Sequence, residues 1–497
     1  MITEAFAVVF SPFTIAVIFG GVALGIIFGV IPGLTATMAV ALCLPISYGL
    51  PPIQGVALLL GLYIGGINGG LILSILLNIP GTPSSIATCF DGYPLTLKGE
   101  AGRALGVGIF YSFLSGVLAF SALIVLAPIL ARFALHFAPF EYFAVTVFSL
   151  TLIATLSGDN LLKGLLAGAL GISFGLIGAA PIDSYRRYTF GISELNIGFS
   201  LLSILIGLYA INEIVQAAGN KYNEKNASME IVAFKLKGFG ISAKEFIQQL
   251  PNFIRSVLIG LGIGVLPGIG GNVTNLISYG AAKNASKYPE KFGTGVIDGV
   301  IAPETSNSAG VGGSLVPTLA LGIPGDPVAA MVLAGLMIHG LVPGPMMFVT
   351  HGVFVWSVFI SVMLANVAML TLNYFGIRLW LRLLKIPKHI LLAVVVSFCV
   401  VGTFGLNNRV FDVQAMFVFA AIGFGLSKLK MPLPPIIMGF ILGPILETNL
   451  RRGLMMTNGD FMPFLTRPIP AVLLSVSFAA VILITVKRLQ KKKQQNQ

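Results

Sequence analysis

The chain has 497 residues, of which 56% are hydrophobic and only 10% are charged, and its mean hydropathy is +0.94. About a quarter of the residues of a soluble globular domain are charged, so this composition excludes a soluble protein and indicates a protein of the lipid bilayer. The formal net charge of +12 at pH 7 does not indicate binding of nucleic acid, because the basic residues lie in short connections between apolar segments rather than in one patch.

Apolar segments of about 18 residues or more, long enough to cross a bilayer, recur along the whole chain. Examples are 104–131 and 351–372. A transmembrane barrel would show short alternating segments instead. We therefore expect an all-α polytopic membrane protein with about 11 full spans plus two hairpins. The first apolar run has no Lys or Arg before it, which is typical of a retained span rather than of a cleavable signal peptide.

The first broken element is predicted at 13–50, where Gly29-Val30-Ile31-Pro32-Gly33 interrupts an apolar run. Polar residues follow this break, at the start of a new helix. Free N–H groups and the positive end of the helix dipole attract anions there. Simple capping of the new helix is the alternative. The predicted substrate contacts are Pro32, Gly33, Thr35 and Thr37.

A second break, Ile79-Pro80-Gly81-Thr82-Pro83, follows a run of small residues from Gly61 to Gly70. Small residues at this spacing favour close packing of helices in membranes. The run also contains Asn68, and a polar side chain at membrane depth is a functional candidate. We therefore include Asn68 among the predicted cation ligands.

The longest polar stretch, 219–249, is interpreted as a connector between two halves rather than as a soluble domain. The predicted divisions are a first membrane repeat at 1–218, a cytoplasmic connector at 219–252, a second and inverted membrane repeat at 253–450, and an extra span with a basic cytoplasmic tail at 451–497.

The second half repeats both breaks, as Gly264-Val265-Leu266-Pro267-Gly268 and Ile323-Pro324-Gly325-Asp326-Pro327. Basic residues flank both ends of the segment 253–282, which is too short for two crossings of about 20 residues each. A re-entrant hairpin with its tip at 267–272 fits better, and we expect the two hairpin tips to face one another. The predicted substrate contacts here are Pro267, Gly268, Gly271, Asn272, Thr274 and Asn275.

The most polar stretch inside an apolar region is Ala302-Pro303-Glu304-Thr305-Ser306-Asn307-Ser308. An ionisable residue at membrane depth is a functional candidate, and the alternative is that Glu304 caps the cytoplasmic end of a helix. Asp326 stands where the first half has Thr82, and is either a cation ligand or the N-cap of a helix at 328–338. The predicted cation ligands are Asn68, Glu304, Ser306, Asn307 and Asp326.

Lys and Arg gather in alternate connections, and the positive-inside rule then places the N-terminus in the periplasm and the C-terminus in the cytoplasm. The connection with Arg132 and Pro139 lies outside on this assignment, whereas its counterpart at 385–387 lies inside. We therefore expect two inverted-topology repeats with re-entrant or broken helices. Paired breaks in two inverted halves are typical of secondary transporters, which bind substrate near the membrane midplane.

Other functions find little support. The sequence has no P-loop pattern and no catalytic constellation, so we expect neither an enzyme nor a bound cofactor. Its three cysteines and four histidines are scattered without the spacing of metal ligands. A passive anion channel is the alternative from another class, although the polar residues cluster at two depths rather than along a whole span.

Long motifs in both halves resemble the large membrane subunit of the tripartite tricarboxylate transporter family. The motifs are 29–45, 78–83, 264–298, 303–309 and 322–326, and the resemblance covers nearly the whole chain. It implies an importer in the bacterial inner membrane for tricarboxylates such as citrate, or for dicarboxylates. It also implies two partners, a small membrane subunit of about four spans and a periplasmic solute-binding protein.

A physical argument favours coupling to cations. Each helix end contributes at most about 2 kcal/mol to binding an anion, whereas desolvating an anionic group costs several kcal/mol, and no Lys or Arg lies next to the predicted tips. Moving each negative charge inward against about 100 mV costs roughly a further 2.3 kcal/mol. We therefore expect sodium symport with Glu304, Asn307 and Asp326 among the oxygen ligands, and proton coupling through Glu304 is the alternative.

Overall fold

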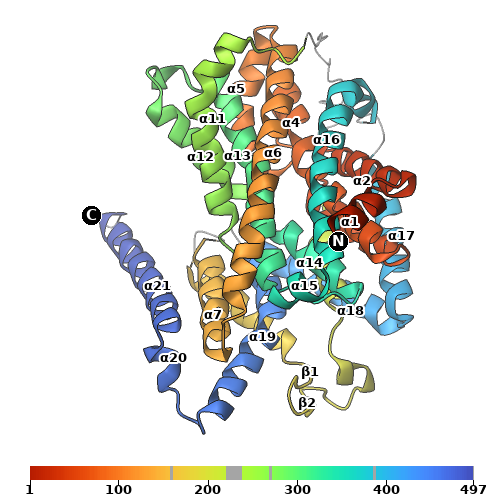
Figure 1. The fold of residues 1–497 in the computed structure, drawn as a ribbon, viewed down its shortest axis with the longest axis vertical. Helices are drawn as coiled ribbons and strands as arrows, with labels where there is room; N and C mark the ends of the chain where they lie inside the picture. The colour runs from red at the N-terminus through yellow and green to blue at the C-terminus, as the bar shows by residue number, and fades with distance from the viewer. Residues whose placement is uncertain (157–160, 220–237, 268–270, 384–387, 496–497) are drawn as a thin grey trace.

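The computed structural model describes residues 1–156, 161–219, 238–267, 271–383 and 388–495. These residues form an all-α membrane protein (Figure 1), and the strands among them are the short antiparallel pair β1 (Gly178–Ala179) and β2 (Arg186–Arg187), with Gly178 opposite Arg187. Five described helices are long and apolar enough to cross a membrane, namely α2, α4, α6, α16 and α18, and shorter apolar helices accompany them. The chain is therefore a multi-pass membrane protein, while the predicted number of full spans stays a prediction.

The helices of the first half run from the N-terminus to the predicted connector. They are α1 (Ile2–Val9), α2 (Pro12–Val30), α3 (Ala36–Tyr48), α4 (Pro52–Leu77), η1 (Pro83–Ser85), α5 (Ile86–Leu97), α6 (Ala101–Ala134), α7 (Pro139–Leu156), α8 (Leu161–Gly175), η2 (Ser193–Ile197), α9 (Leu201–Leu205), the π-helical turn η3 (Ile206–Ile211) and α10 (Asn212–Gly219).

The helices of the second half begin with α11, which starts inside the range predicted for the connector. They are α11 (Ala243–Gly264), α12 (Gly271–Ala285), η5 (Pro289–Lys291), α13 (Asp298–Leu321), α14 (Pro327–Ile338), α15 (Pro345–Thr350), α16 (Gly352–Leu383), α17 (Lys388–Asn407), α18 (Val410–Lys428), α19 (Pro434–Met456), α20 (Met462–Thr466) and α21 (Pro468–Gln495).

The helices end and resume at the breaks read from the sequence. In the first hairpin α2 ends at Val30 and α3 begins at Ala36, and Gly33 between them has a φ of +86°, which glycine adopts without steric cost. At the second breaks, α4 ends on Asn78 and α13 ends on Gly322, and both residues are left-handed. Asn and Gly are the residues that most often end helices in this way, so the local signals suffice to place these ends.

Helix pairs in the two halves cross at matched glycines. A Cβ atom added to Gly29 in α2 would lie 2.4 Å from the Gly66 carbonyl oxygen in α4. A Cβ atom added to Gly264 in α11 would lie 2.6 Å from the Gly310 carbonyl oxygen in α13. Because no side chain separates the backbones at these points, α2 packs directly on α4, and α11 packs directly on α13.

The two halves also pack against each other. The long helix α6 of the first half lies along α13, and α16 of the second half lies along α4. Figure 1 shows α4, α5, α11 and α12 in the upper part of the molecule and α7, α19 and the β1–β2 hairpin in the lower part, with α6 running between them. Each of α4 and α13 therefore packs along a long helix from the opposite half.

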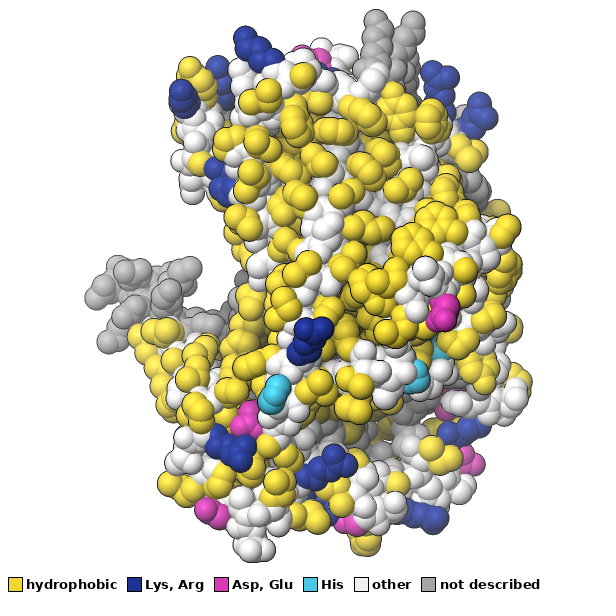
Figure 2. Space-filling model, in the orientation of Figure 1, with side chains coloured by type: hydrophobic (Ala, Val, Ile, Leu, Met, Phe, Trp, Pro, Cys, Tyr) yellow, Lys and Arg dark blue, Asp and Glu magenta, His cyan; other side chains and the backbone are white. Residues whose placement is uncertain are grey.

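The surface fits a bilayer. Figure 2 shows hydrophobic side chains over most of this face, with Lys and Arg side chains gathered near its top and bottom. Ion pairs join segments that the charge pattern assigns to the same side of the membrane. On the predicted cytoplasmic side Arg103 pairs with Glu245 at 2.7 Å, and on the predicted periplasmic side Arg187 pairs with Glu447 at 2.6 Å.

Part of the predicted connector is helical. Residues 220–237 lie outside the described residues, but α11 begins at Ala243, within the range 219–252 given to the connector. Ser242 and Glu245 form a capping box there, in which each side chain accepts a hydrogen bond from the backbone of the other. Part of this polar stretch is therefore the capped N-terminal part of α11.

Candidate substrate site

An internal cavity of about 150 Å³ lies where broken elements of both halves meet. The start of α3 and the η1 turn come from the first half, and the start of α14 comes from the second. The last segment of the first half, η3 with α10, closes the cavity together with the start of α19. The lining residues are Thr35, Ala36, Thr37, Ile67, Thr82, Pro83, Ser84, Tyr209, Glu213, Asp326, Pro327, Val328 and Pro434.

Two capped helix starts, those of α3 and α14, line this cavity. Thr35 is the N-cap of α3, and its hydroxyl accepts from the Met38 N–H at 3.2 Å. Asp326 is the N-cap of α14, and its carboxylate accepts from the Ala329 N–H at 2.8 Å. The capping alternatives considered for both residues are therefore correct, and capping does not remove either residue from the cavity wall.

The first break of the chain contributes the predicted substrate contacts unevenly. Thr35 and Thr37 line the cavity, whereas Pro32 and Gly33 do not. Pro32 is half-buried and Gly33 is exposed at the turn between α2 and α3. The break itself shapes the hairpin, and the residues just after it face the cavity.

Two carboxylates and no Lys, Arg or His are among the lining residues. Glu213 accepts a hydrogen bond from the Thr35 hydroxyl at 2.7 Å. Asp326 accepts one from the Tyr63 hydroxyl of α4, so this bond joins the two halves. The cavity therefore combines positive helix ends and hydroxyl donors with two acidic groups, an arrangement suited to holding an anion and cations together.

The second hairpin contacts the η1 turn through α12. Pro267 is buried. Gly268 lies outside the described residues, and α12 begins at Gly271, followed by Asn272. Thr274 is buried and donates to the Ser306 carbonyl at 3.4 Å. Asn275 donates to the Pro83 carbonyl at 3.3 Å, which ties α12 to a residue of the cavity wall. The described part of this hairpin therefore contacts a residue of the cavity wall but does not itself line the cavity.

Glu304 lies away from the cavity. It is fully buried inside α13, where it accepts from the hydroxyls of Thr88 at 2.5 Å and Ser112 at 3.3 Å. The alternative that Glu304 caps the end of a helix is wrong, because α13 begins at Asp298 and Glu304 lies beyond its first turn. Glu304 joins α13 of the second half to α5 and α6 of the first.

The other predicted cation ligands lie on α4 and α13. The Asn68 side-chain oxygen accepts from the Ser308 hydroxyl at 2.9 Å, and Ser306 donates to the Pro303 carbonyl at 3.1 Å. Asn307 is fully buried, and neither side-chain polar atom has a hydrogen-bond partner among the described residues. Of the five predicted cation ligands, only Asp326 reaches the cavity.

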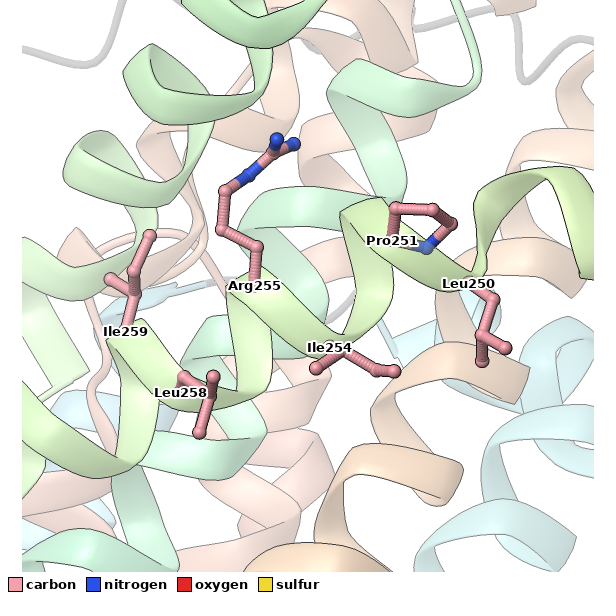
Figure 3. A pocket seen from close by; sticks show the side chains of 6 residues that line it. All are labelled: Leu250, Pro251, Ile254, Arg255, Leu258 and Ile259. Carbon is pink, nitrogen blue, oxygen red and sulfur yellow. The ribbon is translucent and has the colours of Figure 1, made fainter.

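A larger hollow of about 670 Å³ has a different character. It is an open groove along one helix, α11, lined by Leu250, Pro251, Ile254, Arg255, Leu258 and Ile259. Figure 3 shows the Arg255 side chain pointing away from those of Ile254 and Leu258. Because the groove is apolar and contains none of the predicted contacts, it fits a helix surface that faces lipid rather than a substrate site.

The sequence did not single out Tyr209 and Glu213, which line the cavity, or Tyr63, whose hydroxyl donates to Asp326. Glu213 carried a usable signal, since it is an acid at the end of the apolar run 201–216. Its position next to the polar connector made it resemble an ordinary charged residue at a helix end. Tyr63 and Tyr209 gave no signal, because tyrosines are common in apolar segments.

A profile of the Tripartite tricarboxylate transporter TctA family matches residues 15–438, a range that contains every residue of the cavity wall. No solved structure matches the chain.

Two relatives from Agrobacterium vitis are similar to the chain. The first, described as "Uncharacterized 52.8 kDa protein in TAR-I ttuC' 3'region", is 36% identical over 488 residues, which make up 98% of this chain and 96% of that protein. The second, described as "Uncharacterized protein in TAR-II ttuC' 3'region", is 37% identical over 233 residues, 47% of this chain and 96% of that protein. The match to the first relative therefore extends over both halves of the chain.

Proposed function

Because the chain belongs to the Tripartite tricarboxylate transporter TctA family, we propose that it is the large membrane subunit of a cation-coupled secondary transporter that imports small carboxylates. A solute-binding protein in the periplasm delivers the substrate, and a small membrane subunit of about four spans completes the complex in the bacterial inner membrane. The observation that carries this proposal is the cavity of about 150 Å³ at the meeting of the broken helices.

The chemistry of the cavity supports a carboxylate substrate. The N-terminus of α3 supplies backbone N–H groups, and the starts of α3 and α14 supply the positive ends of two helix dipoles. The hydroxyls of Thr37, Thr82 and Ser84 belong to lining residues and are hydrogen-bond donors. The volume lies below the roughly 300–1,000 Å³ of pockets for drug-sized ligands. A compact di- or tricarboxylate, such as succinate or citrate, therefore fits better than a larger molecule.

The same cavity supports coupling to cations. Glu213 and Asp326 line it without any basic residue beside them, so an anionic substrate that enters alone would meet two like charges. Bound sodium ions or protons neutralise these carboxylates and allow the substrate to bind. They also offset the cost of moving the substrate inward, which is roughly 2.3 kcal/mol per negative charge at about 100 mV. Sodium is favoured because hydroxyl, carboxylate and carbonyl oxygens are the ligands of hard cations.

Alternating access follows from the repeated breaks. The matched glycine crossings of α2 with α4 and of α11 with α13 support two repeats of one packing arrangement. If the repeats are inverted, one arrangement used in both directions gives inward-open and outward-open states of similar energy. The broken helices then move against the long helices α6 and α16.

Uptake into vesicles tests this proposal. The chain is reconstituted with its small partner subunit, and labelled citrate or succinate is supplied with the binding protein. We expect saturable uptake that collapses when choline replaces sodium at constant pH. Uptake that persists and follows a proton gradient would indicate proton coupling. Flux that does not saturate and ignores both gradients would contradict the carrier and support the passive channel.

A further inference from the structure

The turn that carries Tyr209 and Glu213 belongs to neither predicted hairpin, yet both side chains line the cavity. The two residues are four positions apart, so they lie on the same side of the helix. Tyr209 lies in the π-helical turn η3, and Glu213 follows in α10. Turns of π-helix occur frequently at functional sites, because the extra residue per turn redirects side chains.

Glu213 has fewer hydrogen-bond donors than the other carboxylates packed between the two halves. Asp91 accepts three backbone N–H bonds and a tyrosine hydroxyl, Glu304 accepts two hydroxyls, and Asp326 accepts a tyrosine hydroxyl and a backbone N–H. Among the described residues, Glu213 accepts only the Thr35 hydroxyl, at 2.7 Å. Glu213 is half-buried, and a carboxylate shielded from water is stabilised by a partner charge or a proton. Glu213 is therefore the acid in the cavity that most needs a cation.

Tyr209 lacks a partner for its hydroxyl. The residue is 6% exposed, and its hydroxyl has no hydrogen-bond partner among the described residues. A buried hydroxyl without a partner is unfavourable, and this one belongs to a residue of the cavity wall. The natural partner of a phenolic donor at this place is an oxygen of the bound substrate.

We propose that the turn from Tyr209 to Glu213 is the element that couples substrate to cation. Glu213, together with the Thr35 hydroxyl, binds the co-transported monovalent cation, and Tyr209 donates a hydrogen bond to the substrate carboxylate. The inference rests on the proposed function and deepens it, because it assigns the cation to Glu213 instead of Glu304. The cation and the carboxylate then lie one helical turn apart, close enough for each to favour the binding of the other.

The coupling has a structural route. Thr35 caps α3 in the first hairpin, and Glu213 follows the π-helical turn, so a cation held by both joins two elements that are far apart in the chain. The charged or titratable side chains around this cation are Asp326 and Tyr209, and the described cavity wall has no Lys, Arg or His. A bound cation is thus the positive charge that the wall itself does not supply.

Binding of labelled citrate to the full chain in nanodiscs, together with its small partner subunit, tests the inference. One arm varies sodium against choline at constant pH, and the other varies pH in choline, which distinguishes a sodium ion from a proton. We expect Glu213→Gln to abolish the cation dependence of citrate binding, because the amide mimics the neutralised acid. We expect Tyr209→Phe to weaken citrate binding about tenfold or more while the cation dependence is kept.

Matched variants keep the test decisive. Tyr111→Phe removes another buried hydroxyl without a described partner, but one that lies outside the cavity, and we expect unchanged binding. Glu141→Gln is the control for Glu213→Gln, because Glu141 is a buried acid on α7 outside the cavity, and we expect it to keep the cation dependence. Where Glu213→Gln fails to fold, Glu213→Asp retains the carboxylate, and we expect weaker binding that still depends on the cation.

The outcomes separate this inference from the proposed function. If Glu304→Gln removes the cation dependence and Glu213→Gln does not, the assignment is wrong. Full-affinity binding by Tyr209→Phe overturns the role of Tyr209. A wild-type complex that binds neither citrate nor succinate contradicts the proposed function itself, whereas a wild type that binds while both variants behave like it contradicts only the inference.

Discussion

The two Pro-Gly breaks that follow α4 and α13 share a backbone arrangement and differ in side-chain chemistry. A Cβ atom on Gly81 would lie 2.3 Å from the Gly29 carbonyl oxygen, and one on Gly325 would lie 2.8 Å from the Gly264 carbonyl oxygen. The residue after each glycine caps a new helix, but it is Thr82 in the first half and Asp326 in the second.

A repeated fold can therefore hold an asymmetric site. Glycine fixes the close approach of the backbones, so it is required in both halves. The capping position only needs an acceptor for a backbone N–H, which both a hydroxyl and a carboxylate supply. The two halves were therefore free to diverge there, one toward a neutral cap and the other toward an acidic one.

Alanine at the matched glycine crossings should break the shared arrangement and have the largest effect. In Gly29→Ala and Gly264→Ala the new methyl group would lie 2.4 and 2.6 Å from a backbone oxygen of the neighbouring helix, so the helices must separate. We expect each variant to lose about 3 kcal/mol of folding stability. The measurement is the midpoint of thermal unfolding in nanodiscs.

Each of these helices contains its own control. Gly20 in α2 and Gly262 in α11 have no atom within 4 Å of an added Cβ. We expect Gly20→Ala and Gly262→Ala to leave the unfolding midpoint unchanged or to raise it, because alanine favours the helix. Equal losses in test and control variants would contradict the account of the crossings.

A second difference between the halves concerns Asp91 on α5, whose carboxylate binds backbone N–H groups of the loop that precedes α13. Its fully buried carboxylate accepts from the N–H groups of Gly293, Gly295 and Val296 at 3.0, 2.7 and 3.0 Å. We expect Asp91→Ala to cost about 2 kcal/mol and to speed hydrogen exchange of these three amides, since they lose their acceptor.

A control for this variant is an exposed acid with one similar bond. Asp460 accepts from the Met462 N–H at 2.8 Å. We expect Asp460→Ala to cost less than about 1 kcal/mol, because water replaces the lost acceptor. Unchanged exchange at 293–296 in Asp91→Ala would show that the carboxylate does not hold this loop.

Asp326→Thr makes the cap of the second half resemble that of the first. The new side chain still caps α14, but it no longer accepts the hydrogen bond from Tyr63. We expect the free energy of unfolding to fall by about 1–2 kcal/mol, because the buried hydroxyl of Tyr63 loses its acceptor. In a double-mutant cycle with Tyr63→Phe we expect a coupling energy of about 1 kcal/mol. Purely additive losses would mean that this bond does not join the two halves.

The smallest effect is expected far from the breaks, at the exposed pair of Arg451 and Asp183, whose charged atoms lie 2.5 Å apart. The hydrogen bond from Arg451 holds the pKa of Asp183 below its usual value. A lowered pKa gives stability that is present above the usual pKa of the group and is lost as the pH falls through the lowered value. We therefore expect Asp183→Asn to differ slightly from wild type at neutral pH and to converge with it in acid, as followed by unfolding midpoints.

The sequence predicted the parts of the site that depend on local signals. Pro and Gly mark the breaks, and the capping residues Thr35 and Asp326 follow from their positions next to them. Glu213 and Tyr209 were missed, because a π-helical turn has no sequence pattern and their place in the cavity depends on tertiary packing. The bond from Tyr63 to Asp326 spans 263 positions in the chain, a separation that no local pattern predicts.

A map of the complex by electron cryomicroscopy with bound citrate tests the central claim most directly. The account predicts density for the substrate in the cavity between Thr35, Thr82 and Tyr209, with a carboxylate group within hydrogen-bonding distance of the Tyr209 hydroxyl. Density in the groove along α11, with the cavity unchanged and closed to the substrate, would contradict it.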